Sequence, residues 1–208
     1  MKPAPKPLFG IGLVLLAMAI LPGIDVCAKF LGQQGVPVVQ MVWARFFFGS
    51  LFTLPFALAM EGKAALRPVN PMFNALRATL LIGGTICFFM ALHTLSIADT
   101  LAIYFVQPVL ITALSPLLLG ENVGVRRWIT VALGFIGVLI IIRPGLVAFN
   151  VGSLFALMSG TASALYIIVT RHLTGKANAM VTTFQSSVIG AAGLSVAAPL
   201  YWSPASGE

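Results

Sequence analysis

Five side chains with the chemistry to bind or move a charged group lie inside strongly apolar stretches of this sequence. These stretches approach the roughly 20 residues of a membrane span, and polar groups at that depth are costly. An arginine at the centre of a span costs about 2.5–3.5 kcal/mol. The five residues could line one polar cavity for substrate binding or coupling: Asp25, Arg45, His93, Tyr104 and Gln107.

Each of these residues also has a purely structural explanation. Asp25 and Arg45 fall at similar depths and could form an ion pair that only fixes the packing of neighbouring helices. The two explanations are compatible, and both stay open. For His93 we favour a packed histidine near the interface, and for Gln107 a hydrogen bond between helices is an equal alternative to ligand contact.

Prolines inside the apolar stretches predict bends or breaks. A proline leaves the backbone carbonyl one turn earlier without its helical hydrogen bond and can bend the helix. Such breaks often face a polar cavity, although a static kink is the alternative. We assign a structural or gating role to Pro22, Pro108 and Pro116, and prefer a static kink for Pro55 and Pro199.

Two further patterns predict contacts between helices. Small residues recur every four positions in one stretch, which predicts close packing inside the molecule rather than a dimer seam. They are Gly152, Ala156, Gly160 and Ala164. The last stretch carries a polar set that is either a second cavity lining or a source of hydrogen bonds between helices. It comprises Thr182, Thr183, Gln185, Ser186 and Ser187.

The composition excludes a soluble, disordered or fibrous protein. Of the 208 residues, 59% are hydrophobic and only 8% are charged, against about a quarter charged in an ordinary soluble domain. The net charge of +7 comes from Lys and Arg scattered between apolar stretches, which argues against nucleic-acid binding. Cys27 and Cys87 lie in apolar stretches, so we expect no metal site, and no motif indicates a cofactor.

Seven apolar stretches are long enough to cross a membrane as helices. Their apolar and polar residues do not alternate, which argues against membrane-spanning strands. We therefore predict an all-α integral membrane protein, a polytopic helix bundle. The predicted spans are residues 8–31, 38–60, 75–97, 100–119, 128–142, 151–170 and 179–202.

The distribution of Lys and Arg predicts the orientation, because cytoplasmic loops carry an excess of these residues. Only Lys29 and Arg143 fall on the side opposite the amino terminus. We therefore expect a cytoplasmic amino terminus in a cell (inner) membrane. The basic residues on the amino-terminal side are Lys2, Lys6, Lys63, Arg67, Arg77, Arg126, Arg127, Arg171 and Lys176.

The sequence shows a weak internal repeat at an offset of 142 residues. Gly10 then aligns with Gly152 and Lys29 with Arg171, and the hydropathy pattern agrees over the whole overlap. The first unit has five spans, so the second unit enters the membrane from the other side, as in the inverted repeats of secondary transporters. We expect a first repeat over residues 1–146 and a partial second repeat over residues 147–208.

Several motifs together resemble the EamA-type repeat of the drug/metabolite transporter superfamily. Pro108 is followed by SPLLLGE at 115–121, a basic turn GVRRW at 124–128, a short span with GFIGVL at 134–139, and RPG at 143–145. Asp25-x-x-x-Lys29 and Ala44-Arg45-Phe46 are also similar to that family.

The resemblance implies ten spans in two inverted five-helix repeats with both ends in the cytoplasm. It also implies secondary transport of small metabolites, and it suggests a structural or gating role for Glu121. By this comparison the chain stops after span seven, as a truncated form would, and three further spans would follow Glu208.

We therefore predict a membrane transporter, importer or exporter, that moves a small polar metabolite by alternating access and is not an enzyme. Its predicted partners are a small-molecule substrate and the lipid bilayer. Amino acids, riboflavin, S-adenosylmethionine and toxic metabolites all fit the resemblance. The alternatives are a seven-span receptor, which would need an external amino terminus, and an intramembrane enzyme, for which no catalytic group can be assembled.

Overall fold

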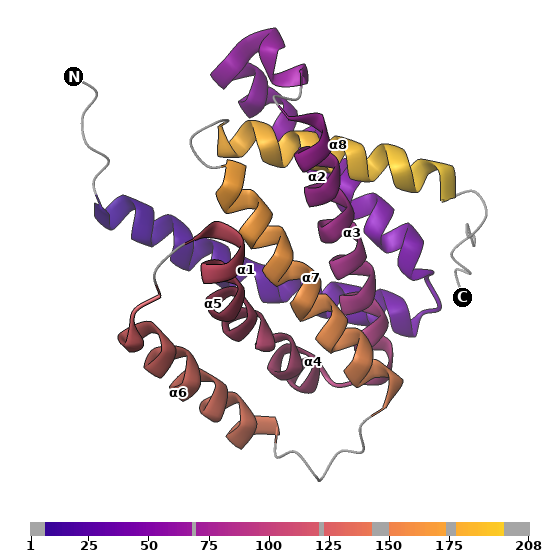
Figure 1. The fold of residues 1–208 in the computed structure, drawn as a ribbon. Helices are drawn as coiled ribbons and strands as arrows, with labels where there is room; N and C mark the ends of the chain where they lie inside the picture. Colours follow the sequence, from indigo (N-terminus) through magenta and orange to yellow (C-terminus); the bar gives the residue numbers. More distant parts are fainter. Residues whose placement is uncertain (1–6, 68–69, 121–122, 143–149, 174–177, 198–208) are drawn as a thin grey trace.

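The computed structural model describes residues 7–67, 70–120, 123–142, 150–173 and 178–197, and every regular element among them is a helix. The helices are α1 (Pro7–Gln33), α2 (Val38–Glu61), η1 (Gly62–Leu66), α3 (Pro71–Thr94), α4 (Ile97–Tyr104), α5 (Val106–Leu119), α6 (Val125–Ile142), α7 (Val151–Leu173) and α8 (Ala179–Ala197). Figure 1 shows them gathered into one bundle.

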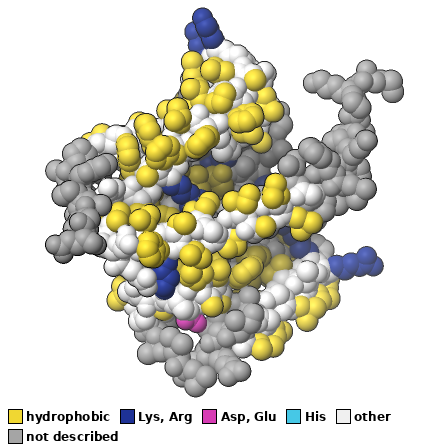
Figure 2. Space-filling model, turned by 180° about the vertical axis from the view of Figure 1, so that it is seen from behind, with side chains coloured by type: hydrophobic (Ala, Val, Ile, Leu, Met, Phe, Trp, Pro, Cys, Tyr) yellow, Lys and Arg dark blue, Asp and Glu magenta, His cyan; other side chains and the backbone are white. Residues whose placement is uncertain are grey.

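The helices have the length and surface of membrane spans, and the predicted fold class is confirmed. Five segments of the described chain are long and apolar enough to cross a bilayer: Val38–Leu66, Pro71–Thr94, Ile97–Leu119, Val151–His172 and Ala179–Val196. Large apolar side chains such as Phe52 and Leu133 are exposed on the outside of the bundle, and Figure 2 shows yellow hydrophobic side chains over much of one face. In lipid this surface is solvated, and helices satisfy their own backbone hydrogen bonds.

The fourth predicted span is interrupted, which corrects the single helix expected over residues 100–119. It forms two helices that meet at Phe105, where the backbone has φ −65° and ψ 1°. Pro108 supplies the reason, because it has no N–H to donate to the Tyr104 carbonyl and its ring crowds that oxygen. Pro22, Pro55 and Pro116 instead lie inside continuous helices.

The boundary before this span also differs from the sequence prediction. Ile97, expected to end the third span, begins α4 because Ser96 caps that helix by accepting a hydrogen bond from the Asp99 backbone N–H at 3.0 Å. A serine followed three residues later by a carboxylate is a helix-start signal. The third span consequently ends at Thr94.

Helix α7 packs antiparallel against α3 along nearly the whole length of both (Figure 1). At one end the rings of Phe73 and His172 stack with centroids 5.1 Å apart. Near the middle, Ser159 Oγ donates a hydrogen bond of 2.7 Å to the Gly84 carbonyl. This long contact places α7 centrally, against α3, α4 and α5.

The small residues of α7 form the close contact predicted from their spacing. All four, Gly152, Ala156, Gly160 and Ala164, are buried. Gly160 lies against the break in the fourth span, where a Cβ atom would stand 2.9 Å from the Tyr104 carbonyl oxygen and 2.8 Å from Val106 Cγ1. Only a residue without a side chain fits there.

Helix α8 packs antiparallel against α2. Trp43 Nε1 donates a hydrogen bond of 2.8 Å to Ser195 Oγ. The Phe46 ring fills the space beside Gly190, and Ser187 lies beside Gly49. The four long helices α2, α3, α7 and α8 thus form two antiparallel pairs, which α3 and α8 join by packing on each other.

Basic residues assigned to one membrane side gather at one end of the bundle. Arg126 and Arg127 begin α6 and share a cavity with Arg171 at the end of α7. Lys29 lies at the other end, where its Nζ donates to the Leu95 carbonyl at 2.6 Å. Arg77, counted with the loop charges, is instead buried with 3% of its surface exposed.

The orientation can be tested with two single cysteines at exposed loop positions, after Cys27 and Cys87 are replaced by alanine. Gln34→Cys lies in the turn after α1 and Lys63→Cys in η1, and both positions are exposed. We expect an impermeant thiol reagent to label Gln34→Cys in intact cells and Lys63→Cys only after permeabilisation. Labelling of Lys63→Cys in intact cells would reverse the orientation.

The close contact at Gly160 predicts a destabilising effect of one methyl group. Gly160→Ala should lower the free energy of unfolding by about 1–3 kcal/mol, the usual cost of overpacking, measured by denaturant unfolding in detergent micelles. Gly83→Ala is the matched control, because no atom lies within 4 Å of its added Cβ. If both variants unfolded alike, the close packing of α7 on the broken span would be wrong.

Candidate functional site

Asp25 and Arg45 are the two charged residues predicted at membrane depth, and each influences the other electrostatically in the structure. Asp25 on α1 is half-buried and Arg45 on α2 is exposed, and their charges lie within electrostatic reach of each other. The structure thus brings together the pair that similar depth in the sequence suggested. The packing role and the substrate role of this pair both stay predictions.

Arg45 faces further polar side chains across the bundle. Tyr104, the last residue of α4, and Tyr166 on α7 both lie within electrostatic reach of its guanidinium. Side chains from α1, α4 and α7 therefore all influence this one guanidinium group. Figure 2 shows Lys and Arg side chains in a hollow of one face, between ridges of hydrophobic side chains.

Tyr166 connects this group to a second, buried arginine. Arg77 Nη2 donates a hydrogen bond of 2.8 Å to the Tyr166 hydroxyl, and the guanidinium carbon stands 5.0 Å from the centre of the tyrosine ring. The same nitrogen approaches Thr183 Oγ1 at 3.5 Å. We call Asp25, Arg45, Tyr104, Tyr166 and Arg77 the polar chain.

Arg77 has more donors than the described protein satisfies. Its Nε and Nη1 atoms are buried and have no hydrogen-bond partner among the described residues. Unsatisfied donors on a buried cation are costly, and each one calls for an explanation. The sequence could have indicated that Arg77 lies inside the span. It stands six residues after Pro71, the first residue of α3, which is about 9 Å along the helix at 1.5 Å per residue.

Next to Arg77, the polar set of α8 makes hydrogen bonds between helices. Asn74 Nδ2 donates to Gln185 Oε1 at 3.0 Å, and Gln185 Nε2 donates to the carbonyls of Ala65 at 2.9 Å and Arg67 at 3.2 Å. Gln185 thereby fixes η1 to the bundle. Its neighbours Thr182, Ser186 and Ser187 are buried, whereas Thr183 is exposed.

The remaining predicted site residues do not join the polar chain. His93 lies at the end of α3, where its ring occupies the space beside Gly32 on α1. It borders a small cavity of about 100 Å³ with Lys29. Gln107 is half-buried in the first turn of α5, and Glu121 lies outside the described residues.

The polar chain offers a ligand positive charge, hydroxyl groups and one carboxylate. Within the described residues, no group of three or more His, Cys, Asp or Glu side chains is placed to hold a metal ion. The arrangement is suited to binding a polar solute through charge and hydrogen bonds in a low-dielectric surrounding, where both are strong.

The sequence pattern of the EamA-like transporter family matches residues 8–143 of this chain. The chain belongs to the EamA-like transporter family. This match includes α1 to α6 and therefore four members of the polar chain, Asp25, Arg45, Tyr104 and Arg77. No solved structure matches this EamA-like chain.

Named relatives of the EamA-like chain are transporters. It is 28% identical over 193 residues to an S-adenosylmethionine uptake transporter of Rickettsia bellii (strain RML369-C), with 93% of this chain and 66% of the relative aligned. It is 28% identical over 162 residues to a riboflavin transporter of Brucella anthropi, with 77% of this chain and 57% of the relative aligned. The chain spans about two thirds of the length of the S-adenosylmethionine transporters that it matches.

Removing the Tyr166 hydroxyl tests the connection to Arg77. Tyr166→Phe keeps the ring but takes away the acceptor of a charged donor, so it should lower the free energy of unfolding by about 1.5–3 kcal/mol. Tyr104→Phe is the matched control, because the Tyr104 hydroxyl has no hydrogen bond within the described chain while its ring packs edge-on against Phe88. Equal stability of the two variants in denaturant unfolding would show that the Arg77 hydrogen bond does not stabilise the bundle.

Proposed function

We propose that this EamA-like protein is a secondary transporter that moves a small polar metabolite across the membrane by alternating access. The observation that carries the proposal is the polar chain itself. It crosses the inside of an apolar bundle from Asp25 and Arg45, through Tyr166, to the buried Arg77. Ionisable residues inside a membrane protein are costly, and they commonly mark a substrate or ion pathway.

The chemistry of the polar chain favours a substrate with oxygen acceptors. Arg45 is exposed, and Arg77 keeps two donor atoms without a partner in the described chain. Guanidinium groups bind carboxylates in a bidentate manner. S-adenosylmethionine has a carboxylate, and riboflavin has carbonyl and hydroxyl oxygens, so both substrates named for the relatives suit this lining.

The helix arrangement supports the inverted repeat, with a first unit over residues 1–146 and a second beginning at 147. The offset of 142 makes α2 and α8 equivalent, and these two helices pack antiparallel. A two-fold axis in the membrane plane relates helices that run in opposite directions, as α2 and α8 do. In this scheme the break at Phe105 supplies a joint in the fourth span for alternating access.

The proposed setting is a cell inner membrane with a cytoplasmic amino terminus, as the Lys and Arg distribution indicates. We propose a transport role without catalysis, since Asp25 is the one carboxylate in the polar chain and has no second acid or base beside it there. We also assign the roles by position: Asp25, Arg45 and Tyr104 contact the substrate or coupling ion, while Pro108 shapes the joint.

Uptake into membrane vesicles containing the complete gene product tests the proposal. We expect concentrative uptake of S-adenosylmethionine or riboflavin. Arg45→Gln and Asp25→Asn should each lower uptake about tenfold or more, because 1.4 kcal/mol of lost interaction is tenfold. The double variant should lower uptake by a smaller factor than the product of the two single-variant factors, since it leaves no lone charge.

Lys63→Gln is the matched control, because it removes one charge from exposed η1 and should leave uptake unchanged. Membrane abundance is measured for every variant, so that loss of protein is separated from loss of transport. Normal uptake by both Arg45→Gln and Asp25→Asn would place the substrate path elsewhere.

A further inference from the structure

Helices α3 and α8 pack on each other and join the two antiparallel pairs of the bundle, α3 with α7 and α2 with α8 (Figure 1). We call the contact between α3 and α8 the seam. At the end of the seam far from η1, buried side chains of α1, α2, α3 and α8 form one apolar cluster, which excludes water and holds that end closed. The cluster comprises Ala28, Met41, Val42, Phe46, Phe89, Leu92, Ala191 and Leu194.

The end of the seam near η1 is polar. A second apolar cluster lies there, but its described buried members come from α2, η1 and α8 and not from α3: Ala57, Ala65, Val181 and Phe184. Hydrogen bonds attach α3 to this unit instead. Asn74 Nδ2 donates to Gln185 Oε1 at 3.0 Å. Arg77 Nη2 reaches Thr183 Oγ1 only at 3.5 Å.

The polar atoms of α3 at this end also lack partners. Asn74 Oδ1, Arg77 Nε and Arg77 Nη1 are buried and make no hydrogen bond in the described chain. The two side chains are only 1% and 3% exposed. Burying such atoms without partners costs free energy, and water would restore their hydrogen bonds. The closed seam is therefore less stable at its η1 end than at its apolar end.

Helices α3 and α7, by contrast, are joined along their whole contact. The rings of Phe73 and His172 stack at one end, Ser159 bonds to the Gly84 carbonyl near the middle, and a buried apolar cluster lies at the other end. Arg77 belongs to this pair through its bond of 2.8 Å to Tyr166. A movement at the seam would consequently carry Arg77 and α7 together with α3.

We propose that the η1 end of the seam is a gate, closed in this structure, and that Gln185 is its latch. The α3–α7 pair pivots at the apolar cluster of the seam, the bond between Asn74 and Gln185 breaks, and the three unpartnered atoms meet water. Arg77 then presents free donors to the anionic part of a solute. The inference rests on the proposed transport function, which requires a closed end of the bundle to open.

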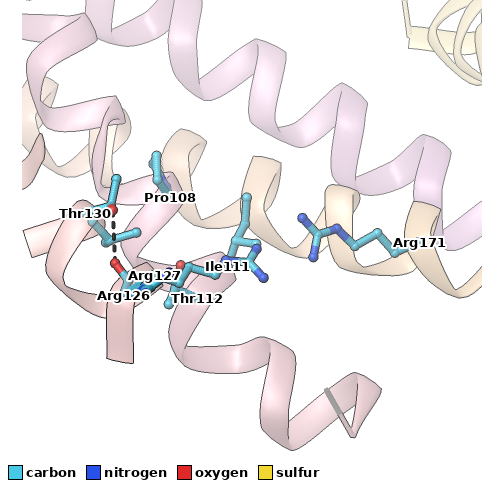
Figure 3. A pocket seen from close by; sticks show the side chains of 8 residues that line it. Pro108, Ile111, Thr112, Arg126, Arg127, Thr130 and Arg171 are labelled. Atoms are coloured by element: carbon cyan, nitrogen blue, oxygen red, sulfur yellow. Dashed lines mark hydrogen bonds between the residues drawn. The ribbon is translucent and has the colours of Figure 1, made fainter. Parts of the chain in front are cut away.

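The gate is separate from the cavity of about 430 Å³ that Figure 3 shows between α5, α6 and α7. None of the described residues that line this cavity belongs to α3 or α8. Access to Arg77 from the η1 end therefore depends on the seam and not on that cavity.

Thiol modification of the purified protein in detergent micelles tests the gate, after Cys27 and Cys87 are replaced by alanine. The reporter is Ala78→Cys, because Ala78 is 0% exposed and follows Asn74 by one turn on the same face of α3. The control reporter is Ala91→Cys, which is also 0% exposed but packs with α7 at the other end of α3.

Each reporter is combined with two variants of α8. Gln185→Leu removes the latch, including its bonds to the carbonyls of Ala65 and Arg67. Ser186→Ala is the matched control, because it removes a buried hydroxyl whose bond stays within α8, to the Thr182 carbonyl.

We expect a hydrophilic thiol reagent to modify Ala78→Cys about tenfold faster or more with Gln185→Leu, because the open population rises when bonds that favour closure are lost. Ser186→Ala should leave this rate unchanged. Ala91→Cys should stay unmodified with either α8 variant, because the α3–α7 pair stays closed.

Equal modification of Ala78→Cys with both α8 variants would overturn the gate. A parallel rise at Ala91→Cys would also overturn it, because the whole bundle would then have loosened. If Gln185→Leu does not fold, Asn74→Leu replaces it, since it breaks the same bond from α3 and leaves the bonds of Gln185 to η1 and Arg67 intact. It should accelerate modification of Ala78→Cys in the same way, and an unchanged rate would contradict the latch.

The labelling does not require transport, so the gate and the proposed function fail separately. Uptake that depends on Arg45 together with unchanged labelling would reject the gate alone. The expected labelling without any uptake would support the gate and reject the proposed transport of the two named substrates.

Discussion

The close contact between Gly160 and the Tyr104 carbonyl is the constraint on which the arrangement of the bundle depends. Pro108 leaves this carbonyl without its helical hydrogen bond and interrupts the fourth span at Phe105. Helix α7 can then approach the interruption, because Gly160 has no side chain to keep it away. The same approach sets the position of α7 in the middle of the bundle, between α3 and the two halves of the broken span.

Because α7 is central, it makes both close packing contacts and hydrogen bonds with its neighbouring helices. Gly160 meets the junction of α4 and α5, while Ser159 and Tyr166 meet α3. Tyr166 thereby reaches the buried Arg77 on one side and the surroundings of Arg45 on the other. Helix α7 therefore contacts both the break in the fourth span, through Gly160, and the buried Arg77, through Tyr166.

Local patterns predicted most of the fold, and contacts between distant residues account for what they missed. Span positions follow from apolar runs, and the buried face of α7 follows from a four-residue period, so both were predicted. Arg77 was counted with the basic residues of the amino-terminal membrane side, because a count of basic residues near span ends takes no account of burial. Its partner Tyr166 lies 89 residues away, and no local spacing indicates that pair. His93 was grouped with the site by depth, but a packed histidine was the favoured explanation, and its ring packs beside Gly32 on α1.

The most direct test is whether water and substrate reach Arg45 from inside the bundle. In a protein without Cys27 and Cys87, Arg45→Cys is compared with Phe47→Cys, which lies about 200° around the helix at nearly the same depth and stacks on Trp43. A hydrophilic thiol reagent should modify Arg45→Cys, more slowly when substrate is present, and should leave Phe47→Cys unmodified. An unreactive Arg45→Cys, or equal reaction at both positions, would contradict a polar path through the bundle.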